Sequence, residues 1–501
     1  LYATVLWHPD VTRVGELAWL GPWPLTAGVG ISRAAPMFVT PGETTHRPLG
    51  DVRLSRTPTQ IVPAPGGLRV VAAPEGTRVS VDGRSTASTF IAADALKSGA
   101  VVALGARIVL LLHVRHRWGS RTPRHGIVGD SDAIVAVRDA VARVATVDLP
   151  VLLLGETGTG KDLVARGIHA ASPRAAKALV SLNLGAVPSS LAAAELFGHA
   201  KGAFTGATEA LPGAFRQADG STLFLDEIGE APPDVQAVLL RALESSEIRP
   251  LGSRAAVPID VRVIAATDAD LDVTVASGRM RNALIQRLSG FTIHLPPLRD
   301  RRDDIGRLLV HFLRQELDLV GEGARLDPVD KPWLPADLIA RAARCDWPGN
   351  VRQLRNFVRQ IVVTNRWRPT FELGPEVEKL LIATGQNGRS EPTPAVLERA
   401  PELTPEPAPR RPSELAPAEV KAALAASDYE IGRAARALGI ARNSLLRLIE
   451  LDPDLVRPKD LPAPVLRDGL RDHGGDIAAL AASLRVSTRG LQLRLQELGL
   501  L

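Results

Sequence analysis

The sequence predicts a multidomain chain with an N-terminal β-sandwich, a central α/β domain and a C-terminal all-α region. Three observations lead to this prediction. Short apolar runs separated by Gly and Pro fill residues 1–120, and apolar runs alternate with helical periodicity between residues 125 and 300. Residues 413–501 are rich in Ala and Leu at helical spacing. With 501 residues, the chain is long enough for about three domains.

The composition favours a protein of a reducing compartment. A formal net charge of +5 is too small, over 501 residues, to indicate nucleic-acid binding by itself. Cys345 is the single cysteine, which excludes an internal disulfide and a multi-cysteine zinc site. Arg107 interrupts the longest apolar stretch, 100–112, and residues 1–30 lack an apolar signal-peptide core. We therefore expect a soluble, cytoplasmic protein.

The individual runs predict the order of the elements. In residues 1–120 we expect strands at 52–54, 68–72, 78–81 and 108–114. In residues 125–300 we expect buried strands and a helix, which together are typical of a largely parallel sheet: Val151–Leu154, Thr222–Leu225, Val261–Ala265 and a helix from Ala133 to Val144. Residues 301–372 are predicted to be mostly helical. Residues 373–412, rich in Pro, Glu and Arg from position 384 onward, predict a linker.

A glycine-rich segment follows the first of these strands and precedes a helix, which is the P-loop arrangement for binding phosphates. Its residues are Gly155, Glu156, Thr157, Gly158, Thr159, Gly160, Lys161 and Asp162. Glycines let backbone N–H groups wrap the phosphates, and the helix N-terminus adds a favourable dipole. Lys161 would neutralise the β- and γ-phosphate oxygens of a nucleotide such as ATP. Asp162 stands where Ser or Thr is usual in this motif.

The strand Thr222–Leu225 ends in two acids. An apolar strand with this ending suits the handling of Mg²⁺ and the activation of water. We expect Asp226 to hold the Mg²⁺, mostly through water, and Glu227 to polarise the attacking water.

A phenylalanine flanked by small residues lies between these two motifs, in Gly202, Ala203, Phe204, Thr205, Gly206 and Ala207. An exposed apolar loop tip usually contacts a partner. A tight turn whose Phe packs into the core explains the pattern equally well, and the residues alone leave both interpretations open.

From about residue 126 to 373 the chain resembles the sigma-54-dependent transcriptional activators, the bacterial enhancer-binding proteins of AAA+ ATPase type. The segment Glu195–Lys201 followed by residues 202–207 carries this resemblance. It implies that residues 202–207 contact sigma-54 and couple ATP hydrolysis to promoter opening. It also implies that residues 301–372 form the helical lid of the AAA+ domain.

The resemblance implies roles for further residues. Asn183 matches the Asn that holds the catalytic Glu inactive until the loop moves. Arg281 and Arg287 match the pair that reaches the γ-phosphate of a neighbouring subunit, and Arg352 matches the lid arginine called sensor II. An arginine acting in trans stabilises the transition state only in an assembled ring. The resemblance therefore implies an oligomer, and in this family a hexamer.

The central region also departs from the family. Asp268 follows Ala265, Ala266 and Thr267, where the sensor I position is usually Asn. A carboxylate near the γ-phosphate would repel it unless it is protonated or turned away. We expect Asp268 to affect the rate of ATP turnover more than the fold.

The N-terminal part resembles a forkhead-associated (FHA) domain. Gly30–Arg33, Leu54–Arg56 and the runs between residues 96 and 112 match its motifs. The resemblance implies that Arg33, Ser55 and Arg56 bind a phosphothreonine protein. Pro58 stands near the usual His, and Asp82 replaces an Asn, which would disfavour an anionic ligand. The alternative is a β-sandwich used only for packing or docking.

The C-terminal region contains an internal repeat. Ala435, Leu438 and Leu445 recur 46 positions later as Ala481, Leu484 and Leu491, and Ile431 and Ile440 follow the same spacing. The repeat resembles the Fis-type helix-turn-helix, which implies DNA contacts from Arg442, Asn443, Arg447, Arg489 and Arg494. Residues 413–501 have no net charge, which weakens the electrostatic footprint of a DNA binder. One copy as a dimerisation module, or a plain helical bundle, is the alternative.

Together these features predict a sigma-54-dependent transcriptional regulator that binds upstream DNA. Its oligomeric ring would hydrolyse ATP to remodel sigma-54 RNA polymerase and open the promoter. One alternative is an AAA+ remodelling ATPase with another protein target. The other is an FHA-containing scaffold with a catalytically weak ATPase, which Asp268 would support.

Overall fold

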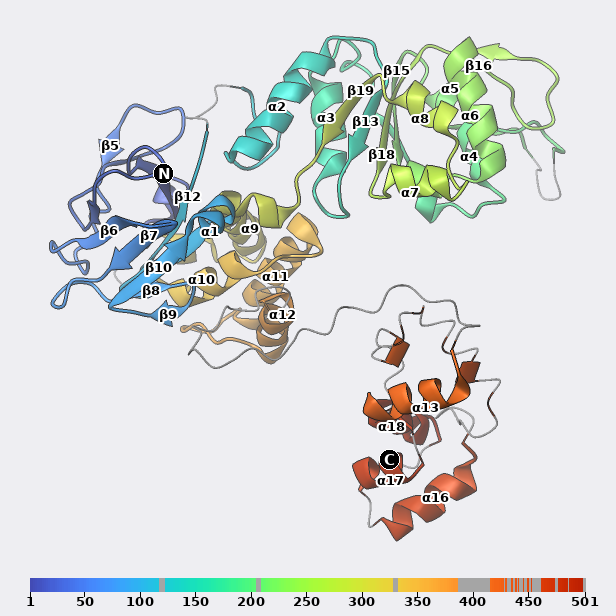
Figure 1. Cartoon of the computed structure of the whole chain (residues 1–501). Coiled ribbons are helices and arrows are strands. Elements are labelled where there is room, and N and C mark those ends of the chain that lie inside the picture. Colours follow the sequence, from blue (N-terminus) through green and yellow to red (C-terminus); the bar gives the residue numbers. More distant parts are fainter. Residues whose placement is uncertain are drawn as a thin grey trace. The chain divides into compact units, whose positions relative to one another are not determined.

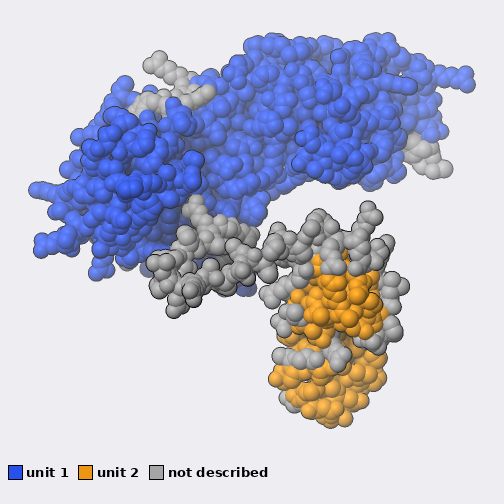
Figure 2. All heavy atoms as spheres, in the orientation of Figure 1, with its two compact units in different colours: residues 1–390 blue, residues 391–501 orange. Residues whose placement is uncertain are grey.

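The computed structural model describes residues 1–116, 122–203, 209–327 and 332–385 continuously. Beyond residue 414 it describes 415–427, 429, 434–435, 438, 440, 445, 448–449, 452, 461–473, 476–484 and 486–498. The chain forms two compact units, Leu1–Ser390 and Glu391–Leu501, and each is described by itself (Figure 2).

The N-terminal part of the first unit is β-rich, as predicted (Figure 1). One sheet has the order β5-β4-β2-β1-β12-β11-β8-β9. Its strands are β1 (Tyr2–Trp7), β2 (Leu17–Trp19), β4 (Phe38–Val39), β5 (His46–Arg47), β8 (Val79–Val81), β9 (Arg84–Ser85), β11 (Ala100–Leu104) and β12 (Ile108–His113). The other sheet has the order β10-β7-β6-β3, with β3 (Val29–Ile31), β6 (Thr59–Ala64), β7 (Gly67–Val71) and β10 (Ser88–Ala92). Side chains from both sheets, including Val5, Ile61, Val70 and Leu110, share one buried core, so the two sheets form a sandwich.

The strand predicted at 52–54 is not formed. The carboxylate of Asp51 accepts a hydrogen bond from the Arg53 amide at 2.8 Å, and the Asp51 carbonyl accepts one from the Leu54 amide at 3.0 Å. Asp at the first position of a turn makes such bonds readily. The segment therefore turns, and the Val52 side chain is 72% exposed.

The central part is an α/β domain, as predicted. A parallel sheet has the order β14-β15-β18-β13-β19. Its strands are β13 (Val151–Leu154), β14 (Val180–Asn183), β15 (Ser221–Asp226), β18 (Val261–Thr267) and β19 (Phe291–His294). Successive side chains of a strand enter opposite cores, because they point to opposite faces of the sheet. Leu153 and Ile264 pack in the core with helices α2 (Asp132–Ala145) and α3 (Lys161–Ala170). Leu152 and Val263 pack in the core with α4 (Ala192–Phe197), α5 (Ala214–Gln217), α6 (Pro233–Ser245) and α8 (Asn282–Leu288).

Shorter elements complete the first unit: α1 (Ala93–Ser98), α7 (Leu271–Ala276) and the small hairpin of β16 (Glu247–Ile248) and β17 (Val257–Pro258). The lid is helical, as predicted, with α9 (Ile305–Leu319), α10 (Ala336–Arg344), α11 (Asn350–Thr364) and α12 (Pro375–Gly385). Helix α12 lies inside the segment predicted as a linker. Val377 and Leu381 are buried in the lid core, and burial of this apolar face makes the segment part of the lid. Residues 386–412 of the predicted linker lie outside the described residues.

The second unit contains two helical cores with matching positions. The first is built on α13 (Pro417–Ala426) and buries Leu424, Ala435, Leu438 and Leu445, among others. The second is built on α16 (Ala463–Asp472), α17 (Ile477–Ser483) and α18 (Thr488–Glu497). Its members Leu470, Ala481, Leu484 and Leu491 each lie 46 positions after their counterparts. The repeat in the sequence is therefore a repeat of core positions. Over the described ranges of both units, no helix combines the length and apolarity needed to cross a bilayer.

Candidate functional site

The glycine-rich loop joins β13 to α3 and lies against the lid. Strand β13 lies between β18 and β19, so the loop that follows it is flanked by the carboxyl ends of two other strands. Open α/β sheets bind ligands at the carboxyl ends of their strands. Gly158 has a left-handed φ of 78°, and a Cβ at this position would lie 2.4 Å from the carbonyl oxygen of Gly349. The loop and the lid can approach this closely because Gly158 has no side chain.

Lys161 is the first residue of α3 and is nearly buried. Its Nζ donates to the carbonyl oxygens of Gly155 at 2.7 Å and Glu156 at 3.3 Å. Burial lowers the pKa of the Lys161 ammonium, while the carboxylates of Asp268, Asp226 and Glu227 raise it. Helix α3 has Gly160 as its N-cap and no side-chain cap, so its first N–H groups are available to an anion. This combination of an ammonium group and an uncapped helix fits the phosphates of a nucleotide.

The two predicted acids lie at the end of β15, beside the end of β14. Asn183 and Asp226 are paired in the register of these strands, and the Asn183 Nδ2 donates to an Asp226 carboxylate oxygen at 3.4 Å. The other Asp226 oxygen accepts from the Glu227 amide at 3.0 Å. Glu227 has a left-handed φ of 54°, and its carboxylate lies against Gly185. Asn183, Asp226 and Glu227 are thus brought together, with the Asn183 amide on Asp226 in this structure.

Asp268 follows β18, the strand that lies between β15 with its acids and β13 with the P-loop. The Thr157 hydroxyl donates a short hydrogen bond to its carboxylate. The Asp268 carboxylate also belongs to the charges that act on Lys161. Asp268 therefore lies beside the P-loop, where β18 ends.

The lid is fastened to the P-loop by both side-chain and backbone groups. Arg299 donates to the two carboxylate oxygens of Glu156 at 2.6 and 2.9 Å, and its guanidinium holds the Glu156 pKa below its usual range. Asn350 Nδ2 donates to the same carboxylate and to the Thr157 carbonyl, each at 3.1 Å. The amide of Arg352 donates to the Gly158 carbonyl at 3.3 Å. The predicted sensor II residue thus lies directly on the nucleotide loop.

Arg299 and Asn350 were not among the residues predicted from the sequence. Arg299 belongs to a dense run of charges, 299–304, which could have indicated a set of specific ion pairs. Nothing in the local pattern around Asn350 indicated that its amide reaches a loop nearly two hundred positions earlier.

The two arginines predicted to act on a neighbouring subunit lie at α8. Arg281 is the N-cap of this helix, and its amide donates to the Gln236 side chain at 2.9 Å. The Arg287 guanidinium donates to the Leu243 carbonyl at the end of α6, at 2.8 and 3.1 Å. Both side chains are exposed. They belong to the α6–α8 side of the domain, and their role in trans remains a prediction.

The predicted sigma-54 contact is described only at its base. Phe204, Thr205, Gly206 and Ala207 lie outside the described residues. His199 and Leu211 are paired by two backbone hydrogen bonds of 3.1 Å, and the Ala200 amide donates to the Leu251 carbonyl at 2.9 Å. Phe197 stacks on Phe215 just below, with ring centroids 5.7 Å apart. The segment that leads into the predicted contact through Gly202 and Ala203 is therefore fixed by hydrogen bonds to two other parts of the chain, at Leu211 and Leu251.

The predicted phosphothreonine residues come from adjacent loops of the sandwich. The Arg33 amide donates to the Ser55 carbonyl at 3.1 Å, and the Arg33 guanidinium donates to the Val52 carbonyl at 3.3 Å. Arg56 is exposed next to Ser55. The three residues are thus neighbours. Asp82 is bonded elsewhere: its carboxylate accepts a hydrogen bond from the Val101 amide at 3.0 Å, and its carbonyl accepts one from Arg344 of the lid at 2.6 Å.

The predicted DNA-contacting residues are for the most part not described. Arg442, Asn443 and Arg447 lie outside the described residues, and for Arg489 only the backbone, within α18, is described. Arg494 is a partly buried residue of the same helix. Its position on α18 is compatible with either the DNA-binding prediction or a helical bundle.

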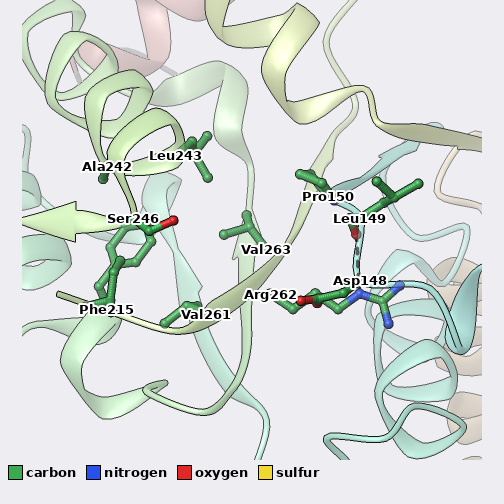
Figure 3. Close-up of a pocket in the computed structure, with 11 residues that line it drawn as sticks. Asp148, Leu149, Pro150, Phe215, Ala242, Leu243, Ser246, Val261, Arg262 and Val263 are labelled. Atoms are coloured by element: carbon green, nitrogen blue, oxygen red, sulfur yellow. Dashed lines mark hydrogen bonds between the residues drawn. The ribbon is translucent and has the colours of Figure 1, made fainter.

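A separate cavity of about 90 Å³ lies on the α/β domain (Figure 3). It is lined by Asp148, Phe215, Ser246, Val261, Arg262 and their neighbours. Arg262 donates to the carbonyls of Val144 and Ala145 at 2.7 and 2.8 Å, so it ties the end of α2 to β18. Pockets that bind drug-sized ligands measure about 300–1,000 Å³. The cavity is too small for a nucleotide.

Comparison with known proteins identifies the two central regions. The sigma-54 interaction domain matches residues 127–294, and the AAA+ ATPase lid domain matches residues 299–370. The transcriptional regulatory protein ZraR of Klebsiella oxytoca is 38% identical over 377 residues, which cover 72% of this chain and 79% of that protein.

Two further relatives match over the central part. The hydrogenase transcriptional regulatory protein HoxA of Cupriavidus necator is 48% identical over 228 residues, or 45% of this chain and 46% of HoxA. The DNA-binding transcriptional regulator NtrC of Escherichia coli is 45% identical over 255 residues, or 51% of each chain. The match thus spans about half the length of these two relatives.

Proposed function

Because the chain belongs to the family of sigma-54-dependent transcriptional regulators, we propose that it hydrolyses ATP to open sigma-54 promoters. The observation that supports this most directly is the set of groups around Lys161. Its ammonium, the uncapped start of α3 and the acids at the end of β15 suit a nucleoside triphosphate. Mg²⁺ is usually bound by one or two carboxylates with substrate phosphates, and Asp226 beside Glu227 fits that pattern.

In this proposal each group has one task. Lys161 and the loop amides bind the β- and γ-phosphates, and Asp226 holds the metal. Glu227 accepts a proton from the attacking water, and Asn183 holds Glu227 inactive until the loop at residues 202–207 moves. Arg281 and Arg287 enter the site of the neighbouring subunit, where they stabilise the transition-state charge. The active form is therefore a ring, a hexamer in this family, whose sigma-54 contact includes Phe204 and Thr205.

The N-terminal domain receives the regulatory signal, and the C-terminal region selects the DNA site. The neighbouring positions of Arg33 and Ser55 support an FHA-like domain that binds a phosphothreonine protein, with Arg56 beside them. The two matching cores of the second unit support tandem Fis-type modules that bind upstream DNA. In the second copy Arg489 and Arg494 would contact DNA. In the first copy Arg442 and Asn443 would reach base edges and Arg447 a phosphate.

The test is ATP-dependent open-complex formation with purified chain, sigma-54 RNA polymerase and a sigma-54 promoter. Opening that requires ATP supports the proposal. Lys161→Ala is expected to lose nucleotide binding or hydrolysis, whereas Thr205→Ala is expected to hydrolyse ATP and fail to open the promoter. Full activation by Thr205→Ala would contradict the coupling role of the loop.

The contact between Thr157 and Asp268 favours a second function, an FHA-containing scaffold with a weak ATPase. Absence of hydrolysis in an assembled ring, unchanged after removal of residues 1–120, would support the scaffold over the activator. Hydrolysis without opening would instead point to a remodelling ATPase with another target.

A further inference from the structure

The central strands β1, β12 and β11 of the larger sheet of the N-terminal sandwich are buried on both faces. Along β12, Leu110 and Leu112 enter the core of the sandwich, while Val109 and Leu111 enter the core of the lid. Along β11, Val102 and Val101 divide in the same way. Alternate residues of a strand point to opposite faces. One face of this sheet therefore packs on the second sheet, and the other packs on helices α9 and α10 of the lid.

Two glycines allow a close approach across this interface, Gly306 to a backbone and Gly15 to a side chain. A Cβ on Gly306, in the first turn of α9, would lie 2.3 Å from the Leu6 carbonyl oxygen and 2.8 Å from the Leu6 Cα. A Cβ on Gly15, in the turn before β2, would lie 2.0 Å from the Arg307 Nε. Such a contact between backbones is specific to residues without side chains. The sandwich is therefore fitted to the lid.

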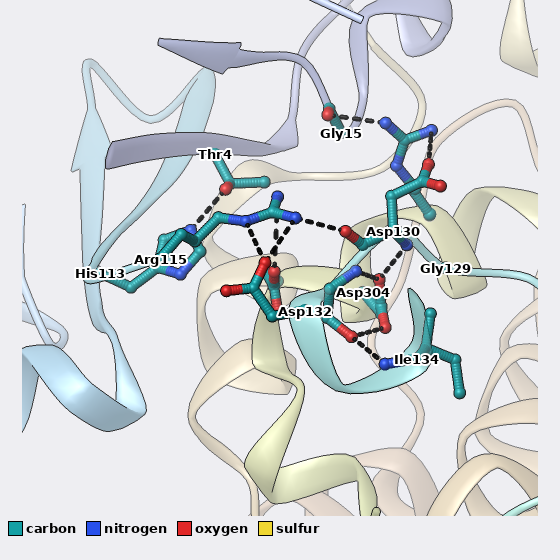
Figure 4. A network of polar contacts seen from close by, with 12 residues as sticks. Thr4, Gly15, His113, Arg115, Gly129, Asp130, Asp132, Ile134 and Asp304 are labelled. Carbon is teal, nitrogen blue, oxygen red and sulfur yellow. Dashed lines mark hydrogen bonds and ion pairs between the residues drawn. The ribbon is translucent and has the colours of Figure 1, made fainter. Parts of the chain in front are cut away.

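A polar junction joins this interface to the α/β domain (Figure 4). Arg307 of α9 donates to the Gly15 carbonyl at 2.7 Å and pairs with Asp130 at 3.0 Å. Asp304 accepts hydrogen bonds from the Asp130 amide at 2.6 Å and from the Ser131 amide and hydroxyl at 2.9 and 2.6 Å. Sandwich, lid and α/β domain thus meet within a few residues, beside the start of α2.

The same segment reaches the nucleotide loop at its other end. Arg301 is buried and donates to the Thr159 carbonyl at 3.1 Å, and Arg299 holds Glu156. Residues 299–307 therefore touch the P-loop on one side and the sandwich on the other.

We propose that the N-terminal sandwich is a clamp on the lid that slows the release of nucleotide. Asp304 and Ser131 meet where the lid joins the α/β domain, which makes this contact a pivot. Arg307 lies about one helical turn beyond Asp304, so its ion pair with Asp130 is off the pivot and opposes rotation of the lid against the α/β domain. The sandwich adds to this resistance, because it is held to the lid by the bond from Arg307 to Gly15 and to the α/β domain by Arg115. The Arg115 guanidinium donates to the Asp130 carbonyl at 2.6 Å and pairs with Asp132 at 3.1 Å. Nucleotide leaves when the first turn of α11 separates from Gly158, and that separation requires the lid to rotate.

This inference rests on the proposed ATPase and deepens it. A ligand of the sandwich would change nucleotide affinity through the lid, and nucleotide would change the affinity of the sandwich for that ligand by the same factor.

Arg307→Ala in the full chain tests the clamp. Asp130 keeps Arg138 at 3.0 Å and Arg124 at 2.9 Å in this variant, so no buried carboxylate is left without a cation. Arg314→Ala is the matched control, because Arg314 is exposed on the same helix two turns further along. We expect Arg307→Ala to release a fluorescent ADP analogue about fivefold faster than the wild type, or more, and Arg314→Ala to match the wild type.

Gly306→Ala separates docking from local helix stability. Ala is a better helix former than Gly, so the substitution stabilises α9 if the sandwich does not rest on it. If the sandwich is docked, the added methyl forces it off Leu6. Hydrogen exchange at α9 is then expected to become faster, together with ADP release.

Unchanged ADP release in Arg307→Ala, or slower exchange at α9 in Gly306→Ala, would overturn the clamp. A wild-type chain that binds no nucleotide would overturn the proposed function along with it, so the two failures are distinguishable.

Discussion

The hydroxyl of Thr157 in the P-loop donates a hydrogen bond to the carboxylate of Asp268 at the end of β18. Thr157 precedes Gly158, where the lid touches the loop, and Asp268 acts electrostatically on Lys161. A negative charge thus lies in the region proposed for the phosphates of ATP, and like charges repel each other.

Asp268→Asn is therefore expected to raise kcat/KM for ATP by about tenfold, which corresponds to about 1.4 kcal/mol of transition-state free energy. The Asn amide can still accept from Thr157 while the charge is removed. Steady-state ATPase assays at a ring-forming protein concentration measure the effect. Asp272→Asn, at an exposed site in α7, is the control and is expected to match the wild type. Slower turnover in Asp268→Asn would mean that the carboxylate takes part in hydrolysis.

The stability of the chain is expected to depend on both the hydrogen bonds and the left-handed backbone conformation of Asn350. This residue is buried, has a left-handed φ of 51°, and its side chain bonds Glu156, the Thr157 carbonyl and the Leu298 amide. Asn350→Ala loses these hydrogen bonds and is expected to lower the free energy of unfolding by about 2–4 kcal/mol. Asn350→Gly loses the same bonds without the left-handed strain and is expected to be milder. Chemical denaturation checks the order, and an Ala variant more stable than the Gly variant would contradict it.

His113 is expected to make the stability of the chain depend on pH. Its Nε2 lies 2.7 Å from the Thr4 hydroxyl, and complete burial lowers the pKa of the imidazole to about 3. The folded state keeps the ring neutral, whereas the unfolded chain binds a proton below about pH 6.5. Stability from this group is complete above pH 6.5 and is lost as the pH falls toward 3.

Comparison with His113→Gln isolates this effect, because other titrating groups are common to both chains. The difference in unfolding free energy, wild type minus variant, is expected to fall by about 1.7 kcal/mol between pH 6.5 and pH 5. A difference that stays constant over this range would show that the ring is protonated in the folded chain.

The two helical cores of the second unit are expected to unfold independently. Leu445 and Leu491 occupy matching positions, and both are fully buried in separate clusters. Each Leu→Ala substitution is expected to cost about 3 kcal/mol within its own core. By hydrogen exchange, Leu491→Ala is expected to expose α16–α18 and spare α13, while Leu445→Ala does the reverse. Loss of protection in both cores from either substitution would indicate a single cooperative bundle.

Much of the central region could be predicted because its signals are local. The strand before the P-loop is β13 at the predicted residues, and the two acids lie at the end of β15. An apolar run ending in glycines or acids has few alternative structures when a helix follows it. The strand predicted at 52–54 is wrong because apolarity was its only signal. Asp51 forms a turn there through a hydrogen bond that apolarity does not reveal.

The contacts that join the domains could not be predicted in this way. The run at 108–114 has apolar residues in nearly every position, which is typical of a strand buried on both faces. This pattern does not indicate which part of the chain covers the second face. The structure shows that the lid does, about two hundred positions later in the sequence.

The sequence by itself determined the central strands β13, β15 and β18, the glycine-rich loop and the two acids after β15, and the repeated core of the second unit. Each of these depends on spacing within a few turns of chain. The tertiary structure alone decided that Arg299 and Asn350 hold the P-loop and that Gly306 lets the sandwich rest on α9. Such contacts depend on how closely two distant backbones approach, and no pattern within either segment encodes that distance.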